Sequence, residues 1–344
     1  MHRILDASFN RAAEGLRVVE DFARFVLEDR HLSREVKELR HALAAAVAVS
    51  PLARRYAARD TAGDVGTTIS TPAELARTDA WHVCKASCER VKQSLRSLEE
   101  YGKCFDSLAS ETIESLRYRF YVVEAALRRS VDAAERLADV RLMVLIEGGA
   151  TRQEFFAMLN PLLAAGVDAI QLREKRLADR ELLDRAQLLV AATRGAQAPR
   201  RTLAIVNDRP DVAAAVDADG VHLGQDDLPV ASARAILGPH KLIGVSTHEL
   251  DQARRAVLDG ADYLGAGPTF PSTTKSFDGF AGWEYLRAVA AEIALPAFAI
   301  GGIAPENAGQ VRETGVARIA VSGAVTKASD PRAAVERLRT AWGD

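Results

Sequence analysis

The sequence predicts an all-α helical domain followed by an eight-stranded parallel α/β barrel, and three observations lead to this expectation. The chain has 344 residues, more than the roughly 250 to 300 that one hydrophobic core usually serves. Apolar side chains recur at three- and four-residue steps through residue 138, which is typical of amphipathic helices. From residue 139 onward, short β-branched runs alternate with helical stretches. We therefore expect two domains, at 1–138 and 139–344.

The composition is that of a globular protein without a strong overall field. Hydrophobic residues make up 48% of the chain, charged residues 27%, and the formal net charge is -2. Nucleic acid is therefore a poor candidate for a partner, and any recognition of phosphate must be local. The amino terminus lacks the apolar core of a signal peptide, and no apolar run is long enough to span a bilayer. We expect a cytoplasmic protein with no membrane partner.

The helical half contains an internal repeat. The segment ASFNRAAEGLRVVEDFAR, which begins at Ala7, aligns without gaps with ASCERVKQSLRSLEEYGK, which begins at Ala86. A duplicated helical hairpin forming a pseudo-twofold bundle is the simplest explanation. Between the copies, residues 59–71 are rich in Gly, Thr and Asp, which predicts a loop.

The repeat also places charged residues at matching positions. The pairs are Arg11 and Arg90, Arg17 and Arg96, and Glu20 and Glu99. They can be ordinary surface pairs three or four residues apart on one helix. They can also form a basic cluster between helices that binds a phosphate. Both interpretations remain open.

Eight β-branched runs follow, separated by segments with helical apolar spacing. They lie at 141–146, 168–173, 202–207, 219–223, 241–246, 261–266, 296–300 and 318–322. Buried parallel strands need cover on both faces, and right-handed crossover helices supply it. Eight such units predict a closed (β/α)8 barrel, the TIM-barrel architecture, and their number and spacing favour it over an open doubly wound sheet.

Polar residues follow every strand except the first, at the rim where the active site of such a barrel lies. They are Gln171, Arg173, Glu174 and Lys175; Asn207, Asp208 and Arg209; Gln225, Asp226 and Asp227; Ser246, Thr247 and His248; residues 267–275; Gly301 and Gly302; and Ser322 and Gly323. We expect them to share one mouth. His222 and His248 carry little signal, because a lone histidine at a strand edge is more often structural.

The second strand predicts a diphosphate site. In QLREK, Gln171, Arg173 and Lys175 lie on one side of an extended segment, because side chains alternate along a strand. A guanidinium and an ammonium facing one space are suited to a diphosphate. The alternative is that these cations pair with Glu174 and Asp208.

The third and fourth strands predict a metal site. Asp208 and Asp227 follow adjacent strands, and two carboxylates at one point repel unless a proton or a cation lies between them. Oxygen ligands favour Mg²⁺, which also shares its coordination with phosphate oxygens. We expect Asp227 to be a ligand and Asp226 to cap the helix that follows.

The last three strands predict a second phosphate site, the usual one in such barrels. The groups that would form it are Ser272, Thr273, Thr274, Lys275, Gly302, Ser322 and Gly323. They offer hydroxyls, an ammonium and closely approaching backbone. Two anion sites in one mouth predict two small phosphorylated substrates.

These motifs resemble thiamine phosphate synthase. In chain order they are QLREK, NDR, DGVHLGQDD, GVSTH, GPTFPSTTK, AIGGI and AVSGAV. The resemblance covers residues 140–344. It implies condensation of hydroxymethylpyrimidine diphosphate with a (carboxy)thiazole phosphate, giving thiamine phosphate and diphosphate with Mg²⁺ as cofactor.

Carried over by motif, the resemblance implies a role for each residue. The pyrimidine diphosphate would be held by Gln171, Leu172, Arg173, Glu174, Lys175, Asn207, Ser246 and Lys275, with Asp208 and Asp227 on the metal. The thiazole phosphate would be held by Ser272, Thr273, Thr274, Gly302, Ser322 and Gly323. Arg173, Lys175, Lys275 and Ser246 would be catalytic. Catalysis would consist of positioning and leaving-group stabilisation, with no protein nucleophile.

The helical half resembles a monofunctional hydroxymethylpyrimidine phosphate kinase, which implies ATP as a further cofactor. The candidate residues are Asn10, Arg11, Glu14, Arg17, Asp60 and Asp64. No GxxxxGK[ST] loop is present, so ATP binding follows from the resemblance alone. Two alternatives for the chain are a thiazole phosphate tautomerase-like barrel and a non-catalytic thiamine phosphate sensor with a helical interaction module. The sequence leaves open whether the chain forms a homo-oligomer.

Overall fold

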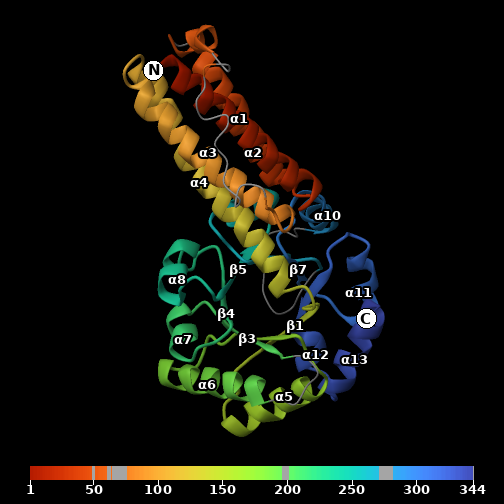
Figure 1. Ribbon diagram of the computed structural model, residues 1–344. Helices are drawn as coiled ribbons and strands as arrows, with labels where there is room; N and C mark the ends of the chain where they lie inside the picture. Colours follow the sequence, from red (N-terminus) through yellow and green to blue (C-terminus); the bar gives the residue numbers. More distant parts are fainter. Residues whose placement is uncertain (49–50, 60–62, 64–75, 196–200, 271–281, 344) are drawn as a thin grey trace. The chain divides into compact units, whose positions relative to one another are not determined.

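Figure 1 shows the computed structural model, which describes residues 1–48, 51–59, 63, 76–195, 201–270 and 282–343. The chain divides into two compact units, Met1–Arg128 and Arg129–Asp344. The division falls inside helix α4 (Ser107–Arg136), whereas the sequence placed the boundary after residue 138. The helical pattern continues to the end of α4, so periodicity alone cannot show where the packing changes. No helix in the described part of the chain is long and apolar enough to cross a membrane.

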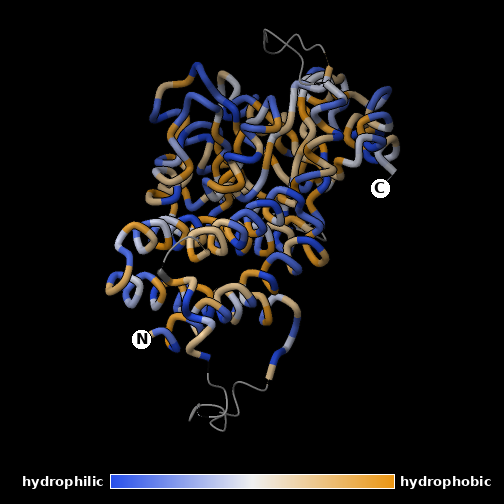
Figure 2. The backbone as a smooth tube through the Cα atoms, turned by 90° about the horizontal axis from the view of Figure 1, so that it is seen from above, coloured by the Kyte–Doolittle hydropathy of each residue, from blue (hydrophilic) through white to orange (hydrophobic). Residues whose placement is uncertain are grey.

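The first unit is built from amphipathic helices. They are α1 (His2–Phe25), α2 (Arg30–Ala48), the 3-10 helix η1 (Pro51–Ala58), α3 (Ala80–Gly102) and the first part of α4. Hydrophobic and hydrophilic residues alternate along them in Figure 2. Helix α1 packs on α2 and α3, and the apolar side chains of Leu16, Val19, Leu95 and Leu98 are buried between helices. Of the loop expected at 59–71, only residues 59 and 63 are described.

The two helical hairpins of this unit make matching contacts. Glu20 accepts a hydrogen bond from Arg40 at 3.0 Å in the first hairpin, and Glu99 accepts one from Arg117 at 2.7 Å in the second. The turns match as well, because the carboxylates of Asp29 and Asp106 each accept from the backbone N–H three residues later. These paired contacts agree with a duplicated hairpin and tie each helix to the next one.

The second unit is a closed barrel of eight parallel strands in chain order, as the sequence predicts. The strands are β1 (Leu142–Ile146), β2 (Ala169–Leu172), β3 (Leu203–Asn207), β4 (Gly220–Leu223), β5 (Leu242–Thr247), β6 (Tyr263–Ala266), β7 (Ala297–Ile300) and β8 (Arg318–Val321). Inward side chains of the strands fill the interior, among them Met143, Ile205, Tyr263 and Phe298. The interior is therefore a packed core rather than a pore.

Helices lie outside the ring of strands (Figure 1). They are α5 (Arg152–Ala164), α6 (Asp179–Gly195), α7 (Pro210–Ala215), α8 (Val230–Leu237), α9 (Leu250–Leu258), α10 (Gly282–Glu292), α11 (Pro305–Arg312), α12 (Gly323–Thr326) and α13 (Pro331–Trp342). They cover the outward side chains of the strands, which explains why the strand sequences are apolar on both faces.

A repeated aspartate fixes the amino-terminal end of the barrel. Asp168, Asp219 and Asp262 each stand directly before or at the start of an even-numbered strand. Each carboxylate accepts a hydrogen bond from a backbone N–H at the start of the preceding strand, at 2.8 Å in all three cases. Each also pairs with an arginine. These contacts stabilise strand pairing at one end and leave the opposite end to the residues of the cavity.

Candidate active site

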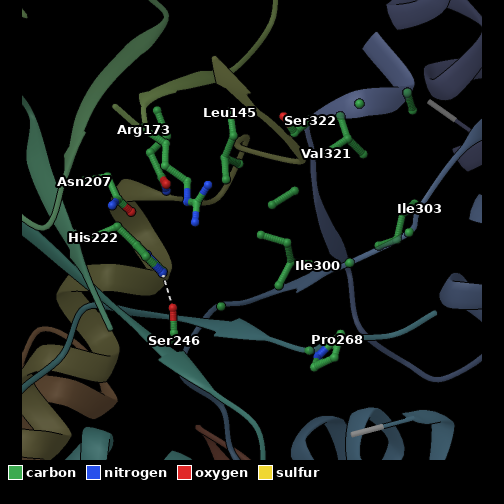
Figure 3. Close-up of a pocket in the computed structure, with 18 of the residues that line it drawn as sticks. Leu145, Arg173, Asn207, His222, Ser246, Pro268, Ile300, Ile303, Val321 and Ser322 are labelled. Carbon is green, nitrogen blue, oxygen red and sulfur yellow. Dashed lines mark hydrogen bonds between the residues drawn. The ribbon is translucent and has the colours of Figure 1, made fainter. Parts of the chain in front are cut away.

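A cavity of about 380 Å³ opens at the carboxyl ends of the strands (Figure 3). The side chains and backbone that line it come from strands on all sides of the barrel. The predicted residues that the structure brings together there are Gln171, Arg173, Asn207, Ser246, Gly302, Ser322 and Gly323. Ser272, Thr273, Thr274 and Lys275 lie outside the described residues.

Arg173 is the predicted cation that faces this cavity. Its backbone N–H donates to the carbonyl of Ile146 at 2.8 Å, which continues the pairing of β1 with β2 beyond the strand. Its half-buried side chain extends into the cavity between Leu145 and His222 (Figure 3). Within the described part of the chain, no carboxylate lies at ion-pair distance from its guanidinium. A half-buried guanidinium without such a partner is suited to an anionic ligand.

One interpretation of the sequence pairs Glu174 with the neighbouring cations, but its carboxylate does not pair with Arg173. Its buried carboxylate instead accepts backbone N–H groups of Gly148, Lys175 and Arg176 at 3.0, 2.8 and 2.7 Å. Burial opposes its ionisation, but these donors outweigh burial and lower the pKa of Glu174. Glu174 therefore holds the loops after β1 and β2 in place.

Leu172 occupies a different environment from its neighbours Gln171 and Arg173. Its side chain is fully buried, because alternation along β2 turns it away from the barrel interior. Only its backbone could therefore meet a ligand. The amide of Gln171 points inward, where its nitrogen contacts the sulfur of Met143 at 3.5 Å, and its buried oxygen has no hydrogen-bond partner within the described part of the chain.

Two carboxylates converge at the rim next to Lys175. Asp208 has a left-handed backbone conformation (φ 62°) and donates its N–H to the carbonyl of His222. Burial, and then the adjacent carboxylate of Asp227, raise the pKa of Asp208, and the charges of Lys175 and Arg173 oppose this rise. The Lys175 ammonium lies 3.6 Å from a carboxylate oxygen of Asp208, so the alternative interpretation, in which the cations of QLREK pair with nearby carboxylates, describes this lysine.

The pair of carboxylates fits a Mg²⁺ ion. A cation between Asp208 and Asp227 would remove the repulsion that raises the pKa of Asp208. Over the ranges that the structure describes, no cluster of three or more His, Cys, Asp or Glu residues could hold a metal. Two protein carboxylates suffice for Mg²⁺, which takes its other oxygens from water and substrate phosphates.

The expected helix cap at Asp226 is wrong. Helix α8 begins at Val230, and its N-cap position is Pro229, which makes no side-chain cap hydrogen bond. Asp226 is exposed, while Asp227 accepts the N–H of Gly224 at 2.6 Å. The extended conformation of Pro229 lengthens the connection, so the turn forms around Asp227 and Asp226 faces solvent.

His222 belongs to the cavity wall, although its sequence context suggested only a structural role. Its Nε2 lies 3.0 Å from the Ser246 hydroxyl and its Nδ1 lies 3.2 Å from the Tyr263 hydroxyl. Burial lowers the pKa of His222 to about 4, so the ring is neutral at physiological pH. Alternation along GVHL places this residue inward at the end of β4, which is the signal that could have identified it.

The side of the cavity formed by β7 and β8 contains close backbone approaches and one unpredicted cation. Gly301 and Gly302 have φ of 101° and 65°, where a side chain would be strained. Lys327 lines the cavity, and its aliphatic carbons pass near Gly323. It follows the short helix α12, beyond the strand ends that the sequence analysis considered.

Those candidates of the helical unit that the structure describes form no comparable cluster. Arg17 pairs with Glu20 and Asp21 on its own helix, at 3.7 and 3.3 Å, and Arg96 pairs with Glu99 and Glu100. The surface-pair interpretation therefore describes these two arginines. Arg11 and Glu14 are exposed, and Asn10 donates to Asp6 at 3.4 Å. Asp60 and Asp64 lie outside the described residues.

Comparison with known proteins agrees with the resemblance in both parts of the chain. Residues 142–325 match the family described as thiamine monophosphate synthase, and residues 3–126 match the ThiD2 family. A thiamine-phosphate synthase of Rhodopirellula baltica is 44% identical over 94% of this chain and 88% of its own length. One of Synechocystis sp. is 42% identical over 98% of this chain and 95% of its own length.

A solved structure shares the barrel. Thiamine phosphate pyrophosphorylase from Pyrococcus furiosus is 39% identical, covers 59% of this chain and 96% of its own, and superimposes with a TM-score of 0.52. The coverage of both full-length relatives extends through the helical unit as well as the barrel. The chain belongs to the thiamine monophosphate synthase family.

Proposed function

We propose that this chain joins hydroxymethylpyrimidine diphosphate to a thiazole phosphate, forming thiamine phosphate and releasing diphosphate. Two relatives that align over 88% and 95% of their own length are named thiamine-phosphate synthase. The observation that carries the proposal is the guanidinium of Arg173, which faces the cavity with no carboxylate at ion-pair distance among the described residues. A diphosphate would supply the missing charge.

The residues in and around the cavity would have two roles, to bind the substrates and to stabilise the leaving diphosphate. Arg173 in the cavity, and Lys175 beside Asp208 at its rim, would neutralise the diphosphate as its oxygen separates from the methylene carbon of the pyrimidine. The thiazole nitrogen would then form the new bond to that carbon, so no protein nucleophile is needed. Asp208 and Asp227 would hold Mg²⁺, which when bound supplies further positive charge to the diphosphate.

The apolar part of the cavity would protect the electron-poor carbon. Leu145, Ile300, Ile303 and Ala320 line the cavity and can hold the two rings against each other. Exclusion of water there would prevent its attack on the pyrimidine carbon and strengthen the interaction of Arg173 with diphosphate. Catalysis would thus depend on positioning and on charge.

The thiazole phosphate would bind across the cavity, against Gly302, Ser322 and Gly323. Close backbone and a hydroxyl suit a phosphate dianion. Lys327 adds an ammonium on the same side. Ser272, Thr273, Thr274 and Lys275 would complete both sites, as the family resemblance implies.

The full-length protein tests this function directly. Purified protein with both phosphorylated precursors and Mg²⁺ should release diphosphate and form thiamine phosphate in equal amounts. A tautomerase-like barrel would change the thiazole phosphate alone, and a sensor would bind thiamine phosphate without turnover. Absence of diphosphate release would refute the synthase activity.

For the helical unit we propose phosphorylation of hydroxymethylpyrimidine phosphate by ATP, which would produce the diphosphate that the barrel consumes. The match of residues 3–126 to the ThiD2 family supports this proposal. The full chain with an Arg173→Ala substitution, given the monophosphate and ATP, should form ADP and accumulate the pyrimidine diphosphate. If no ADP forms, the unit is instead an interaction module. A cytoplasmic location and a homo-oligomer stay predictions.

A further inference from the structure

We propose that Tyr263 and His222 position the hydroxyl of Ser246 as a hydrogen-bond donor to the pyrimidine diphosphate. This inference rests on the proposed synthase function. The three residues come from β6, β4 and β5, and they form a continuous chain from the packed interior to the cavity wall. Tyr263 Oη lies 3.2 Å from His222 Nδ1, and His222 Nε2 lies 3.0 Å from Ser246 Oγ.

The direction of the hydrogen bonds follows from the donors and acceptors available. Tyr263 is 1% exposed, and a buried phenol donates its proton to an acceptor. Within the described part of the chain, the hydrogen-bond partner of this hydroxyl is His222 Nδ1. Nδ1 therefore accepts, and the ring carries its proton on Nε2. The opposite tautomer would leave the buried O–H of Tyr263 without an acceptor.

This tautomer determines what Ser246 can offer to a ligand. Nε2–H donates to Ser246 Oγ, so the single proton of the hydroxyl is not used in this bond. Ser246 is half-buried and lines the cavity, where Figure 3 shows it joined to His222 on the side that also holds Asn207 and Arg173. The hydroxyl proton is thus available to an acceptor atom of the substrate.

Two glycines leave just enough space for the side chains of Tyr263 and His222 inside the barrel. A Cβ at Gly244 would lie 2.1 Å from Cζ of Tyr263 and 2.6 Å from Nδ1 of His222, and one at Gly265 would lie 2.9 Å from Cε1 of His222. The two rings pack at 5.5 Å between centroids, and Phe298 packs edge-on against Tyr263. The rings are therefore fixed before any ligand binds, which makes the donor preorganised.

The test removes the hydroxyl of Tyr263, which begins the hydrogen-bond series, and leaves Ser246 intact. Tyr263→Phe should lower kcat about five- to tenfold, the effect of one neutral hydrogen bond, with KM for the thiazole phosphate unchanged. In a Ser246→Ala background the same substitution should have no further effect, because Tyr263 acts through Ser246. Tyr285→Phe is the matched control. Tyr285 is also buried, and its hydroxyl donates to Thr247, which is not part of the Tyr263–His222–Ser246 hydrogen-bond series. It should leave kcat unchanged.

A second readout does not depend on turnover. Long-range ¹H–¹⁵N NMR of the ligand-free protein, with the signal assigned by His222→Gln, should show the Nε2–H tautomer in the wild type and a mixture of tautomers in Tyr263→Phe. An Nδ1–H tautomer in the wild type would overturn the inference, as would equal losses from Tyr263→Phe with and without Ser246. Failure of the synthase assay alone would refute the proposed function and leave the NMR result standing.

Discussion

The guanidinium of Arg173 is the group on which the proposed chemistry depends most, and substitution there gives the sharpest prediction. Its planar fork can donate two charge-assisted hydrogen bonds to a diphosphate. Each is worth about 1.5 to 3 kcal/mol. Because the side chain makes no ion pair with a carboxylate among the described residues, little of this energy is committed to folding.

Two substitutions at this position separate charge from geometry. Arg173→Lys keeps the charge and loses the fork, so we expect kcat/KM for the pyrimidine diphosphate to fall roughly 10- to 150-fold, the value of one such bond. Arg173→Ala loses both bonds and should lower kcat/KM by about 10² to 10⁴. Steady-state release of diphosphate measures both effects. Circular dichroism melts should show an unchanged Tm.

Arg176→Ala is the matched control for these variants. It removes a guanidinium from the same loop, where Arg176 is 74% exposed and pairs with Glu147. Activity should stay within about twofold of the wild type, because exposed pairs contribute little. The reasoning is refuted if Arg173→Ala keeps kcat/KM within the range of this control while remaining folded.

Three further substitutions test other parts of the account. Asp208→Asn should abolish Mg²⁺-dependent turnover and raise the Tm of the metal-free protein at neutral pH. The pKa of Asp208 is raised in the folded state, so ionisation of its carboxyl costs stability; this cost is absent below the ordinary pKa of an aspartate, grows as the pH rises, and is complete above the raised pKa. An unchanged metal requirement would contradict the assignment. Lys327→Ala should raise KM for the thiazole phosphate about fivefold, the loss of one exposed charged contact, and leave KM for the pyrimidine unchanged. Asp262→Ala should lower the free energy of unfolding by about 3 to 5 kcal/mol, because it leaves Arg234 without its buried partner; urea unfolding with a loss below about 1 kcal/mol would exclude this role.

The barrel could be predicted from the sequence because its strands carry a strong local signal. Buried parallel strands must be apolar on both faces, and each β-branched run became a strand within a residue or two of its expected limits. The rim position of Arg173, Asn207 and Ser246 followed from topology, since the carboxyl ends of parallel strands meet at one edge. Periodicity and topology were sufficient for these features.

Other features depend on contacts that no local pattern encodes. Glu174 stands among the cations of QLREK, yet three backbone N–H groups from two loops engage its carboxylate. The sequence around His222 gives no sign of a functional role, because its two ring nitrogens contact Tyr263 and Ser246, which lie on other strands. Lys327 follows an extra turn of helix whose path the strand pattern does not predict. In each case the deciding partner is distant in sequence.

A crystal of the full chain, soaked with the pyrimidine diphosphate and Mn²⁺, tests most directly whether the diphosphate, its cations and the metal meet at the mouth of one cavity. We predict an anomalous peak between Asp208 and Asp227, with metal–oxygen distances of about 2.1 Å, and diphosphate oxygens bound to the guanidinium of Arg173. A metal bound elsewhere, or a diphosphate that does not contact Arg173, would contradict the account.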